Sequence, residues 1–499
     1  MGRYLVGLLC TLCFSGSLFA QELPLSHPDM KWEFLSHFSD EFDGATLDQK
    51  WTTDVRDWGT WAWESENTYV NNGSLAIRMR QKEKRSDIGK DVYFTSGIAQ
   101  IDETITYGYF EARMKGSSKG QGTCPAFWLY SRSIPEVEEE GYVQYSEIDV
   151  IEIFQIPNKE QTLEMNLHTR IYEDGAFVWK RPGQGNTELC HNSWDAPWHP
   201  SDEYHTYGVM NRVDSIFWYV DGVQRGAKKN HYWHLPMRIT VSMGLRTPYE
   251  KYIDGVRTIM PYPEETPEPG FPTEMYCDYV RVWEAQPQII VDYEKYENDE
   301  FPINLPLVFQ CYFDAGSGHE VIADSYNGIE AILLEKNAQG DIISEDKIEN
   351  PSVIGQQGGN VTFSFDISSY DLTEDLPEGN YYEIIPKFTS SINEGTDIVL
   401  DKPLKGIKLV EEYVGIKEDV LSELSVFPNP ASNRITVKGL PNQETELSLY
   451  NIFGGHVLTK TTVGEVSQTL SIGSLNDGVY LLKVATSNVN KVIKFTKGN

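Results

Sequence analysis

Three carboxylates lie close together in one apolar segment of the chain. They are Glu147, Asp149 and Glu152 in the run YSEIDVIEIF, residues 145–154. In a β-strand, alternate side chains share a face, so Glu147 and Asp149 point to the same side while the apolar residues between them point into the core. Glu152 would face the wrong way unless one extra residue at 150–151 forms a β-bulge, a feature that re-aims side chains beside active sites. With that bulge, all three carboxylates line one groove.

Such a set of acids is typical of enzymes that cut glycosidic bonds. Repulsion and loss of water raise carboxyl pKa values, so some of the three acids should hold a proton. Retaining glycosidases use one ionised and one protonated carboxyl group roughly 5 to 5.5 Å apart. The two glutamate backbones are about four strand steps apart, roughly 13 Å, so both long side chains must lean inward over the shorter Asp149. An exposed acidic strand or a calcium site is the alternative.

The surrounding sequence is that of an all-β protein built from several domains. Short alternating runs such as GSLAIRMR, GYFEARMK and ITVSMGL are separated by Gly, Asn, Asp and Pro, a pattern typical of strands. The 499 residues exceed one ordinary domain, and all 12 tryptophans lie between Trp32 and Trp283. We expect a large sandwich of two packed sheets at residues 21–286. A smaller Ig-like β-sandwich is expected at 287–415, either a spacer or stalk, or a carbohydrate-binding or docking module.

The first twenty residues have the pattern of an export signal. A basic start ending at Arg3 precedes the apolar stretch Tyr4–Phe14, and small residues lead to a cleavage point after Ala20. No later run reaches the roughly 18 to 20 apolar residues that cross a bilayer, so no membrane span is expected. The net charge of −32 argues against nucleic acid as a partner. Cleavage leaves four cysteines, Cys124, Cys190, Cys277 and Cys311. The first three lie in the first domain, so one disulfide within that domain is possible and two are not.

The sequence around the carboxylates resembles glycoside hydrolase family 16. The resemblance runs in order through SDEFDGATLDQKW, FTSGIAQ, YGYFEARMK, CPAFWLY, the ExDxxE strand, YHTYGVMNRVDSIFWYVDGVQ and MYCDYVRVWE, from about residue 38 to 284. It implies a concanavalin-like β-jelly roll whose groove holds a polysaccharide. It also implies Glu147 as nucleophile, Glu152 as acid/base and Asp149 as the residue that orients and tunes the nucleophile, with no cofactor for catalysis.

Aromatic and cationic residues in the same region indicate what kind of polysaccharide is held. The resemblance places Trp128 in the groove, where its ring suits the C–H face of a sugar. His168 follows the carboxylate strand and is expected to hydrogen-bond a sugar, with a purely structural histidine as the alternative. Arg246 ends an apolar strand, ITVSMGLRTPY, which resembles that of κ-carrageenases and implies a sulfate ligand, with Trp179 and Arg181 on an adjoining loop. A salt bridge from Arg246 to a cleft acid is the alternative.

The sequence therefore predicts an exported, endo-acting, retaining hydrolase of β-1,4 bonds in a sulfated red-algal galactan, most closely κ-carrageenan. Furcellaran, agarose, porphyran or a β-glucan are the alternative substrates for the same mechanism. A non-catalytic polysaccharide-binding jelly roll is the alternative from another functional class. We expect a monomer. Weaker candidates for sugar contact are Trp58, Trp61, Trp63, Trp194 and Trp198.

Two further expectations rest on resemblances outside the carboxylate strand. Asp278 resembles the carboxylate that holds calcium in this family, so a structural calcium ion is expected there. Residues 416–499, with FPNPASN and GVYLLKV, resemble the C-terminal sorting domain of type IX secretion. That resemblance implies the type IX secretion machinery as a partner, and a protein that is secreted or attached to the outer-membrane surface.

Overall fold

The computed structural model of the protein divides into two compact units. Met1–Phe301 and Leu305–Val410 form the first unit, and Pro302–Asn304 and Glu411–Asn499 form the second. The predicted export signal lies outside the described residues. The structure describes residues 29–85, 91–183, 185–253, 256–259, 270–297, 299–411, 424–440, 444–451, 456–464, 466–473, 475–476, 478–486 and 490–498.

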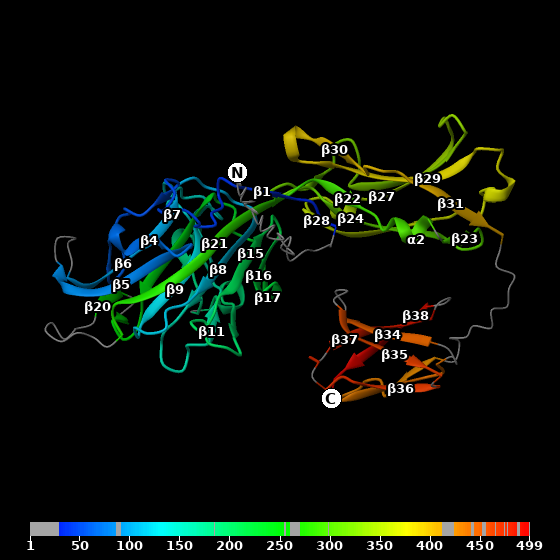
Figure 1. Ribbon diagram of the computed structural model, residues 1–499. Helices are drawn as coiled ribbons and strands as arrows, with labels where there is room; N and C mark the ends of the chain where they lie inside the picture. The colour runs from blue at the N-terminus through cyan, green and yellow to red at the C-terminus, as the bar shows by residue number, and fades with distance from the viewer. Residues whose placement is uncertain are drawn as a thin grey trace, which may run out of the picture. The chain divides into compact units, whose positions relative to one another are not determined.

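A ten-stranded sheet forms one layer of the N-terminal sandwich (Figure 1). Its strand order is β17-β16-β15-β8-β21-β5-β6-β3, with β1 beside β21 and β4 beside β5. In chain order the strands are β1 (Trp32–Phe34), β3 (Ala62–Trp63), β4 (Thr68–Asn71), β5 (Ser74–Arg85), β6 (Val92–Ser96), β8 (Gly108–Lys115), β15 (His205–Asn211), β16 (Ser215–Val220), β17 (Val223–Lys229) and β21 (Thr273–Ala285).

A nine-stranded sheet forms the other layer and carries the three acids. Its order is β13-β12-β10-β9-β18-β7-β2, with β11 beside β10 and β14 beside β11. The strands are β2 (Trp51–Thr52), β7 (Ile98–Ile101), β9 (Thr123–Ser131), β10 (Val143–Ile153), β11 (Thr162–Glu164), β12 (Leu167–Glu173), β13 (Ala176–Lys180), β14 (Ser193–Asp195) and β18 (Met237–Leu245). Outside both sheets are the hairpin β19 (Glu250–Ile253) and β20 (Val256–Ile259), and the short helix α1 (Thr187–Cys190).

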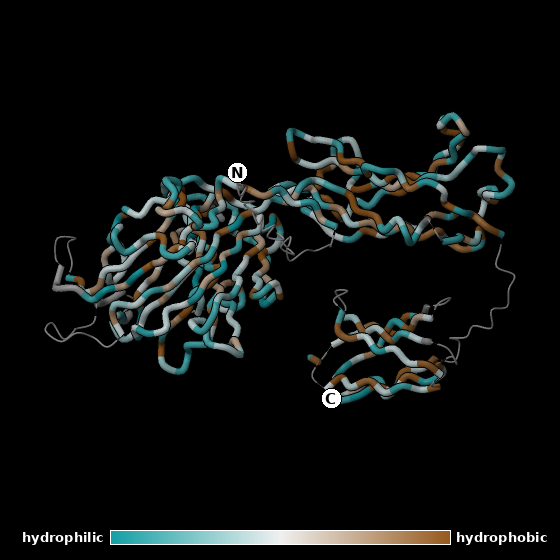
Figure 2. The backbone as a smooth tube through the Cα atoms, viewed as in Figure 1, coloured by the Kyte–Doolittle hydropathy of each residue, from teal (hydrophilic) through white to brown (hydrophobic). Residues whose placement is uncertain are grey.

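Apolar side chains of the two sheets meet in one core. Ile77 and Met114 of the ten-stranded sheet and Phe127 and Ile239 of the nine-stranded sheet all belong to it and are fully buried. Figure 2 shows hydrophobic and hydrophilic residues mixed along these strands, as the alternating pattern of the sequence requires. Removing the apolar faces from water is the main force that holds the layers together. The predicted all-β sandwich of two packed sheets is confirmed.

The carboxylate strand β10 contains the predicted bulge. Its pairing with β9 shifts between Asp149 and Ile151, so Val150 is the extra residue. Because Val150 and Ile151 are both buried, the phase of the strand changes and Glu152 returns to the face of the other two acids. Trp218 of β16 donates its indole N–H to the Asp149 carbonyl at 3.0 Å. A buried tryptophan of the opposite sheet therefore fixes the bulge from behind.

A second, smaller sandwich completes the first unit. One sheet has the order β22-β24-β28, and the other β23-β31-β29-β26-β27 with β25 and β30 beside β29. Arg212 Nη2 lies 3.3 Å from Asp314 Oδ2, so a buried ion pair joins the two sandwiches. The elements are β22 (Gln288–Ile290), α2 (Tyr293–Glu297), β23 (Glu300–Pro302), β24 (Leu307–Asp314), β25 (Val321–Ile322), β26 (Ile329–Lys336), β27 (Ile342–Asn350), β28 (Gly358–Phe365), β29 (Tyr381–Ser390), β30 (Thr396–Val399) and β31 (Leu404–Val410).

The second unit is a small β-sandwich with its own core. Its sheets have the orders β32-β33-β36 and β35-β34-β37-β38, and Ile435, Leu449 and Leu482 lie fully buried between them. The strands are β32 (Ser425–Phe427), β33 (Arg434–Lys438), β34 (Glu444–Asn451), β35 (His456–Val463), β36 (Ser467–Ser471), β37 (Gly478–Ala485) and β38 (Asn490–Lys497).

The cysteines form no disulfide in the described part of the chain. Cys124, Cys190, Cys277 and Cys311 are all free and buried. Two of them have other partners: Cys124 contacts Glu152, and Cys277 donates to the Tyr279 carbonyl. The disulfide that the first domain could have held is therefore not formed. Among the described residues, none of the helices has the length and apolar character needed to cross a bilayer.

Candidate active site

A groove lies on the outer face of the nine-stranded sheet, opposite the core. Its volume is about 890 Å³. Strands β9, β10, β12, β13 and β18 supply most of its floor. The residues that line it are Trp58, Trp61, Trp63, Cys124, Ala126, Trp128, Tyr130, Ser131, Arg132, Ser133, Tyr145, Glu147, Asp149, Glu152, His168, Trp179, Arg181, Arg238, Ser242, Gly244, Arg246 and Glu250.

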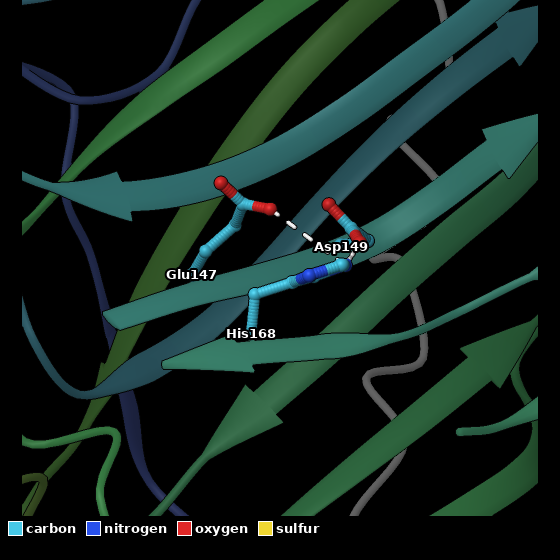
Figure 3. A group of neighbouring side chains, drawn as sticks. All are labelled: Glu147, Asp149 and His168. Atoms are coloured by element: carbon cyan, nitrogen blue, oxygen red, sulfur yellow. Dashed lines mark ion pairs between the residues drawn. The ribbon is translucent and has the colours of Figure 1, made fainter. Parts of the chain in front are cut away.

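The three predicted acids meet in this groove. Glu147, Asp149 and Glu152 all line it, which is the outcome that the predicted bulge requires. Figure 3 shows Glu147 and Asp149 on one strand, with His168 beside them on the neighbouring strand. Strand alternation explains the first pair, and the extra residue Val150 explains why the third acid joins them. The alternative of an exposed acidic strand is excluded, because the side chains of Glu147, Asp149 and Glu152 are only 19%, 6% and 13% exposed.

His168 is held between two carboxylates. Its Nε2 lies 3.2 Å from Asp149 Oδ2 and 3.8 Å from Glu147 Oε1. Burial alone would lower the pKa of His168, but the charges of Glu147 and Asp149 outweigh burial and raise it to about 9. The imidazole is therefore a cation at neutral pH, with both ring nitrogens able to donate. His168 lines the groove beside Glu147, so a hydrogen bond from it to a sugar or to an intermediate stays a prediction.

Asp149 is the most strongly buried of the acids. Burial raises its pKa to about 7, and the nearby charges of Glu152 and Glu147 add to the rise while His168 opposes it. A carboxyl group that shares a proton near neutrality can tune the ionisation of its neighbours. Asp149 is thus an acid of this set whose pKa is raised by burial and by repulsion, as expected from the sequence.

Glu147 is oriented by a tyrosine that the sequence reading missed. The Tyr145 hydroxyl donates a hydrogen bond to Glu147 Oε2. Strand alternation could have identified it, because Tyr145 and Glu147 are two residues apart and share a face. From behind the strand, the Trp233 indole N–H lies 2.9 Å from the Glu147 carbonyl and 3.0 Å from the His168 carbonyl. These contacts fix both the backbone and the side chain of Glu147.

Glu152 is paired with Arg246. Arg246 Nη2 lies 2.5 Å from Glu152 Oε1, and the Cys124 thiol donates to the same oxygen at 3.4 Å. Burial favours the neutral carboxyl, but the charges of Arg246 and His168 outweigh it and hold the pKa of Glu152 below its ordinary value. The salt-bridge alternative for Arg246 is thus what the free protein shows. No sequence signal marked Cys124, because its contact depends on the shape of the groove floor.

Aromatic rings line part of the groove. Trp128 stacks on Tyr130 with ring centroids 4.5 Å apart, and its indole N–H donates to Ser242 Oγ at 3.1 Å. Trp58 packs edge-on against Trp128. Trp61 and Trp63, although largely buried, also line the groove. Trp128 therefore lies in the groove as expected, and so do the three tryptophans of the 58–63 cluster.

The other two tryptophan candidates do not line the groove. Trp198 stacks on His205 with ring centroids 3.4 Å apart. Trp194 carries the guanidinium of Arg225 over its ring at 3.9 Å. Both rings also pack against the main core. Trp194 and Trp198 were therefore wrong as candidates for sugar contact in this groove, because both rings pack against the core of the sandwich.

Trp179 and Arg181 lie at the edge of the groove. Trp179 is 42% exposed, and Arg181 holds its guanidinium 3.9 Å above the Trp179 ring. Tyr145 packs edge-on against the other side of this tryptophan. The prediction of a loop was wrong for Trp179, which belongs to the edge strand β13, and right for Arg181, which follows it. An exposed ring next to a guanidinium presents both an apolar and an anion-binding surface.

Asp278 lies on β21 of the ten-stranded sheet, away from the groove. Arg113 Nη1 lies 2.5 Å from its Oδ2. The Asp278 carboxylate is thus paired with a guanidinium in this structure, and a calcium ion at Asp278 stays a prediction. Among the described residues, one set of three potential ligands lies within 4.8 Å, namely Glu147, Asp149 and His168.

Comparisons with known proteins agree with the fold and the groove. Residues 32–285 match the family model of the β-porphyranase A-D GH16 domain, and residues 425–497 match the secretion system C-terminal sorting domain. The chain is 37% identical over 270 residues to a κ-carrageenase of Pseudoalteromonas carrageenovora, a match covering 52% of this chain and 66% of that protein. About a third of that relative therefore has no counterpart here.

Two other relatives extend the comparison. A β-porphyranase B of Zobellia galactanivorans is 27% identical over 233 residues, which cover 42% of this chain and 76% of that protein. The crystal structure of a κ-carrageenase from Zobellia galactanivorans is 38% identical, with a TM-score of 0.50, and the match covers 53% of this chain and 100% of the other. The C-terminal unit is a type IX secretion sorting domain, and the N-terminal sandwich is a jelly roll. With a matched family model over half of its length, the chain belongs to glycoside hydrolase family 16.

Proposed function

We propose that this glycosidase is an endo-acting, retaining hydrolase of β-1,4 bonds in a sulfated galactan, with κ-carrageenan as its substrate. The observation that carries the proposal is the groove in which Glu147 and Glu152 share a face with two arginines, Arg246 and Arg181. The 37% identity to a κ-carrageenase supports the choice of polymer. No cofactor is needed for the chemistry below.

The proposed reaction has two steps. In the first, a Glu147 oxygen attacks the anomeric carbon and forms a glycosyl ester, while the bond to the leaving oxygen breaks and that oxygen takes the proton of Glu152. In the second, Glu152 removes a proton from water, the water oxygen bonds to the anomeric carbon, and Glu147 leaves as a carboxylate. One water is consumed and the anomeric configuration is kept. Asp149 and His168 hold Glu147 in position and balance its charge in both steps.

The cations of the groove supply the proposed selectivity for sulfate. A guanidinium binds tetrahedral oxyanions through paired N–H donors, which a lysine cannot match. Arg246 would contact a sulfate close to the cleaved bond, and Arg181 with Trp179 would hold the neighbouring sugar by charge and by its apolar face. The total charge of −32 does not exclude an anionic substrate, because the local potential of a groove can oppose the global sign.

Product analysis on a set of purified polysaccharides tests this proposal. We expect cleavage of κ-carrageenan into oligosaccharides and a β-anomer as the first product seen by NMR. The Glu147→Gln protein should lose activity, and Glu152→Gln should lose about 10²- to 10⁴-fold, with unchanged circular dichroism in both. No cleavage of any sulfated galactan would end the substrate proposal, and an α-anomer as first product would end the retaining mechanism.

A porphyran substrate is the second candidate, and one observation favours it. The family model that matches residues 32–285 is that of β-porphyranases, and porphyran belongs in the same assay. Furcellaran, agarose and a β-glucan complete the set as the remaining alternatives from the sequence. Cleavage of porphyran at a higher kcat/KM than κ-carrageenan would replace the first candidate without changing the catalytic residues.

The sorting domain indicates that the enzyme acts outside the cell. A type IX tail directs export, and the protein is then secreted or attached to the cell surface. We propose that the tail brings the groove to a polymer too large to enter the cell. Cell fractionation with and without residues 425–497 tests this: the full chain should reach the medium or the surface, and the truncated chain should remain inside.

A further inference from the structure

Arg246 is paired with Glu152, the carboxylate that must act as the general acid in the proposed reaction. It follows the strand β18, and its Nη1 lies 3.1 Å from the Leu245 carbonyl, while Nη2 lies 2.5 Å from Glu152 Oε1. The Cys124 thiol approaches the same oxygen at 3.4 Å. Both Glu152 and Arg246 line the groove, with side chains 13% and 24% exposed. The pair is thus intact in the free protein and within reach of a bound sugar.

This pairing conflicts with the first proposed step of catalysis. A guanidinium against a carboxylate favours the ionised form, whereas Glu152 must carry a proton when the leaving oxygen departs. Other charges around the Glu152–Arg246 pair are His168 on β12, Asp149 on β10 and Glu250 on β19, and Glu164 lies opposite Glu152 on β11. Of these groups, His168 also favours the ionised form and the acids oppose it. Burial favours the neutral form, so loss of the Arg246 contact would shift Glu152 toward protonation.

We propose that Arg246 changes partner when substrate binds, leaving Glu152 for a sulfate group of the sugar next to the cleaved bond. This inference rests on the proposed function, because it requires a sulfated substrate. The freed Glu152 takes up one proton from solvent and passes it to the leaving oxygen, whose bond to the anomeric carbon breaks with both electrons on that oxygen. The sulfate therefore binds Arg246 and, by drawing it away from Glu152, allows Glu152 to become protonated.

Exchange of the Arg246 partner predicts that the sulfate affects kcat as well as KM, whereas a binding role alone predicts an effect on KM only. A galactan without that sulfate can enter the groove, but Arg246 stays on Glu152 and most of the bound enzyme lacks the acid proton. Desulfation therefore lowers kcat as well as raising KM. If Arg246 served binding alone, desulfation would raise KM and leave kcat unchanged.

Direct titration of Glu152 tests the exchange. The Glu147→Gln protein, which should bind without turnover, is labelled with ¹³C at glutamate carboxyl groups, and the Glu152 signal is identified by its loss in a Glu147→Gln/Glu152→Gln protein. We expect a κ-carrageenan tetrasaccharide to raise the Glu152 midpoint by about one to three pH units, and the desulfated tetrasaccharide to leave it unmoved. A sulfated tetrasaccharide that binds without moving the midpoint overturns the exchange.

Kinetics of Arg246→Gln provide an independent check. Without the guanidinium, kcat/KM on κ-carrageenan should fall, while kcat on the desulfated polymer should rise and its loss at high pH should move to a higher pH. Arg132→Gln is the matched control: Arg132 lines the same groove, is 62% exposed and faces Asp102, so the high-pH limb should stay in place. A fall in kcat on both polymers overturns the exchange. If wild type cleaves no sulfated galactan, the proposed function fails and the exchange fails with it; cleavage without a midpoint shift overturns the exchange alone.

Discussion

At the scale of single residues, the site is a chain of charges that depend on one another. Glu147 is held by Tyr145 and His168, His168 touches Asp149, and Asp149 shares its charge environment with Glu152. Of the adjacent groups Asp149 and His168, the histidine has the higher pKa, about 9 against about 7, so at neutral pH the proton of this pair lies on His168. The raised pKa of Asp149 reflects the unfavourable burial of three carboxylates on one strand.

Asp149→Asn should make the fold more stable at neutral pH while it lowers activity. A carboxyl pKa raised from 3.8 to about 7 means that the folded chain still holds a proton that the unfolded chain has lost. The contribution of Asp149 is therefore fully present below its unfolded pKa and is lost as the pH rises through 7. We expect a higher Tm than wild type at pH 8, by about 2–4 °C for each kcal/mol, and equal Tm values near pH 3.5. A lower Tm at pH 8 contradicts this.

At the scale of elements, the bulge in β10 decides whether three acids or two face the groove. The bulge is held by a residue of the other sheet, since Trp218 donates to the Asp149 carbonyl. Trp233 similarly ties the carbonyls of β10 and β12 together. The ten-stranded sheet and the loop before Pro236 thus shape a groove to which they contribute few side chains.

Trp218→Phe should weaken both the fold and catalysis. The phenyl ring fills most of the space but removes the N–H donor, which costs about 1 to 3 kcal/mol for a buried partner left without its bond. We expect a lower Tm together with a lower kcat, because the bulge is what directs the Glu152 side chain into the groove. Trp283→Phe is the control, because Trp283 is also largely buried but donates nothing to β10. Equal kcat in the two variants would show that the bulge does not need Trp218.

At the scale of the whole molecule, the catalytic sandwich is joined to the second sandwich within one compact unit. The joint contains an ion pair, Arg212 with Asp314, whose side chains are 5% and 0% exposed. Val213 adds a backbone N–H to Gln357 Oε1 at 3.2 Å. A buried charge pair couples the stabilities of the two parts, whether the second sandwich is a spacer or a binding module.

Asp314→Ala should destabilise the unit strongly without changing the chemistry. It leaves the guanidinium of Arg212 buried and unpaired, which costs about 3 to 5 kcal/mol. We expect a clear fall in Tm and an unchanged kcat at temperatures well below it, because neither residue lines the groove. The double variant Arg212→Met/Asp314→Leu removes both charges and should recover most of the Tm. If the single and double variants are equally unstable, the unpaired charge is not the cause.

The thiols offer a second test at this scale. Cys124, Cys190, Cys277 and Cys311 are free and buried. The mature native enzyme should therefore react slowly with a thiol reagent, and four thiols per chain should react after denaturation. The same count without a reductant is expected, because there is no disulfide to open. Two equivalents after denaturation would show that a disulfide forms in the exported protein.

The sequence by itself determined the local features of this protein. The alternation of apolar and polar residues predicted the strands. Glu152 would face away from Glu147 and Asp149 in a regular strand, and this predicted the bulge. Strand pattern and bulge both depend on residues that are neighbours along the chain. The order of motifs from 38 to 284 identified the family, and the tail identified its export route. Trp128, Trp179, Arg181 and Arg246 were also placed correctly in or at the groove.

Only the tertiary structure decided which groups touch. Contacts such as Cys124 and Arg246 on Glu152, His168 between two acids and Trp218 behind the bulge join residues that are 19 to 94 positions apart, and nothing in the sequence fixes such distances. For the same reason the structure moved Trp194 and Trp198 out of the groove and paired Asp278 with Arg113. Charge states follow from burial and from neighbours across strands, so the location of the shared proton could be settled only once the chain was folded.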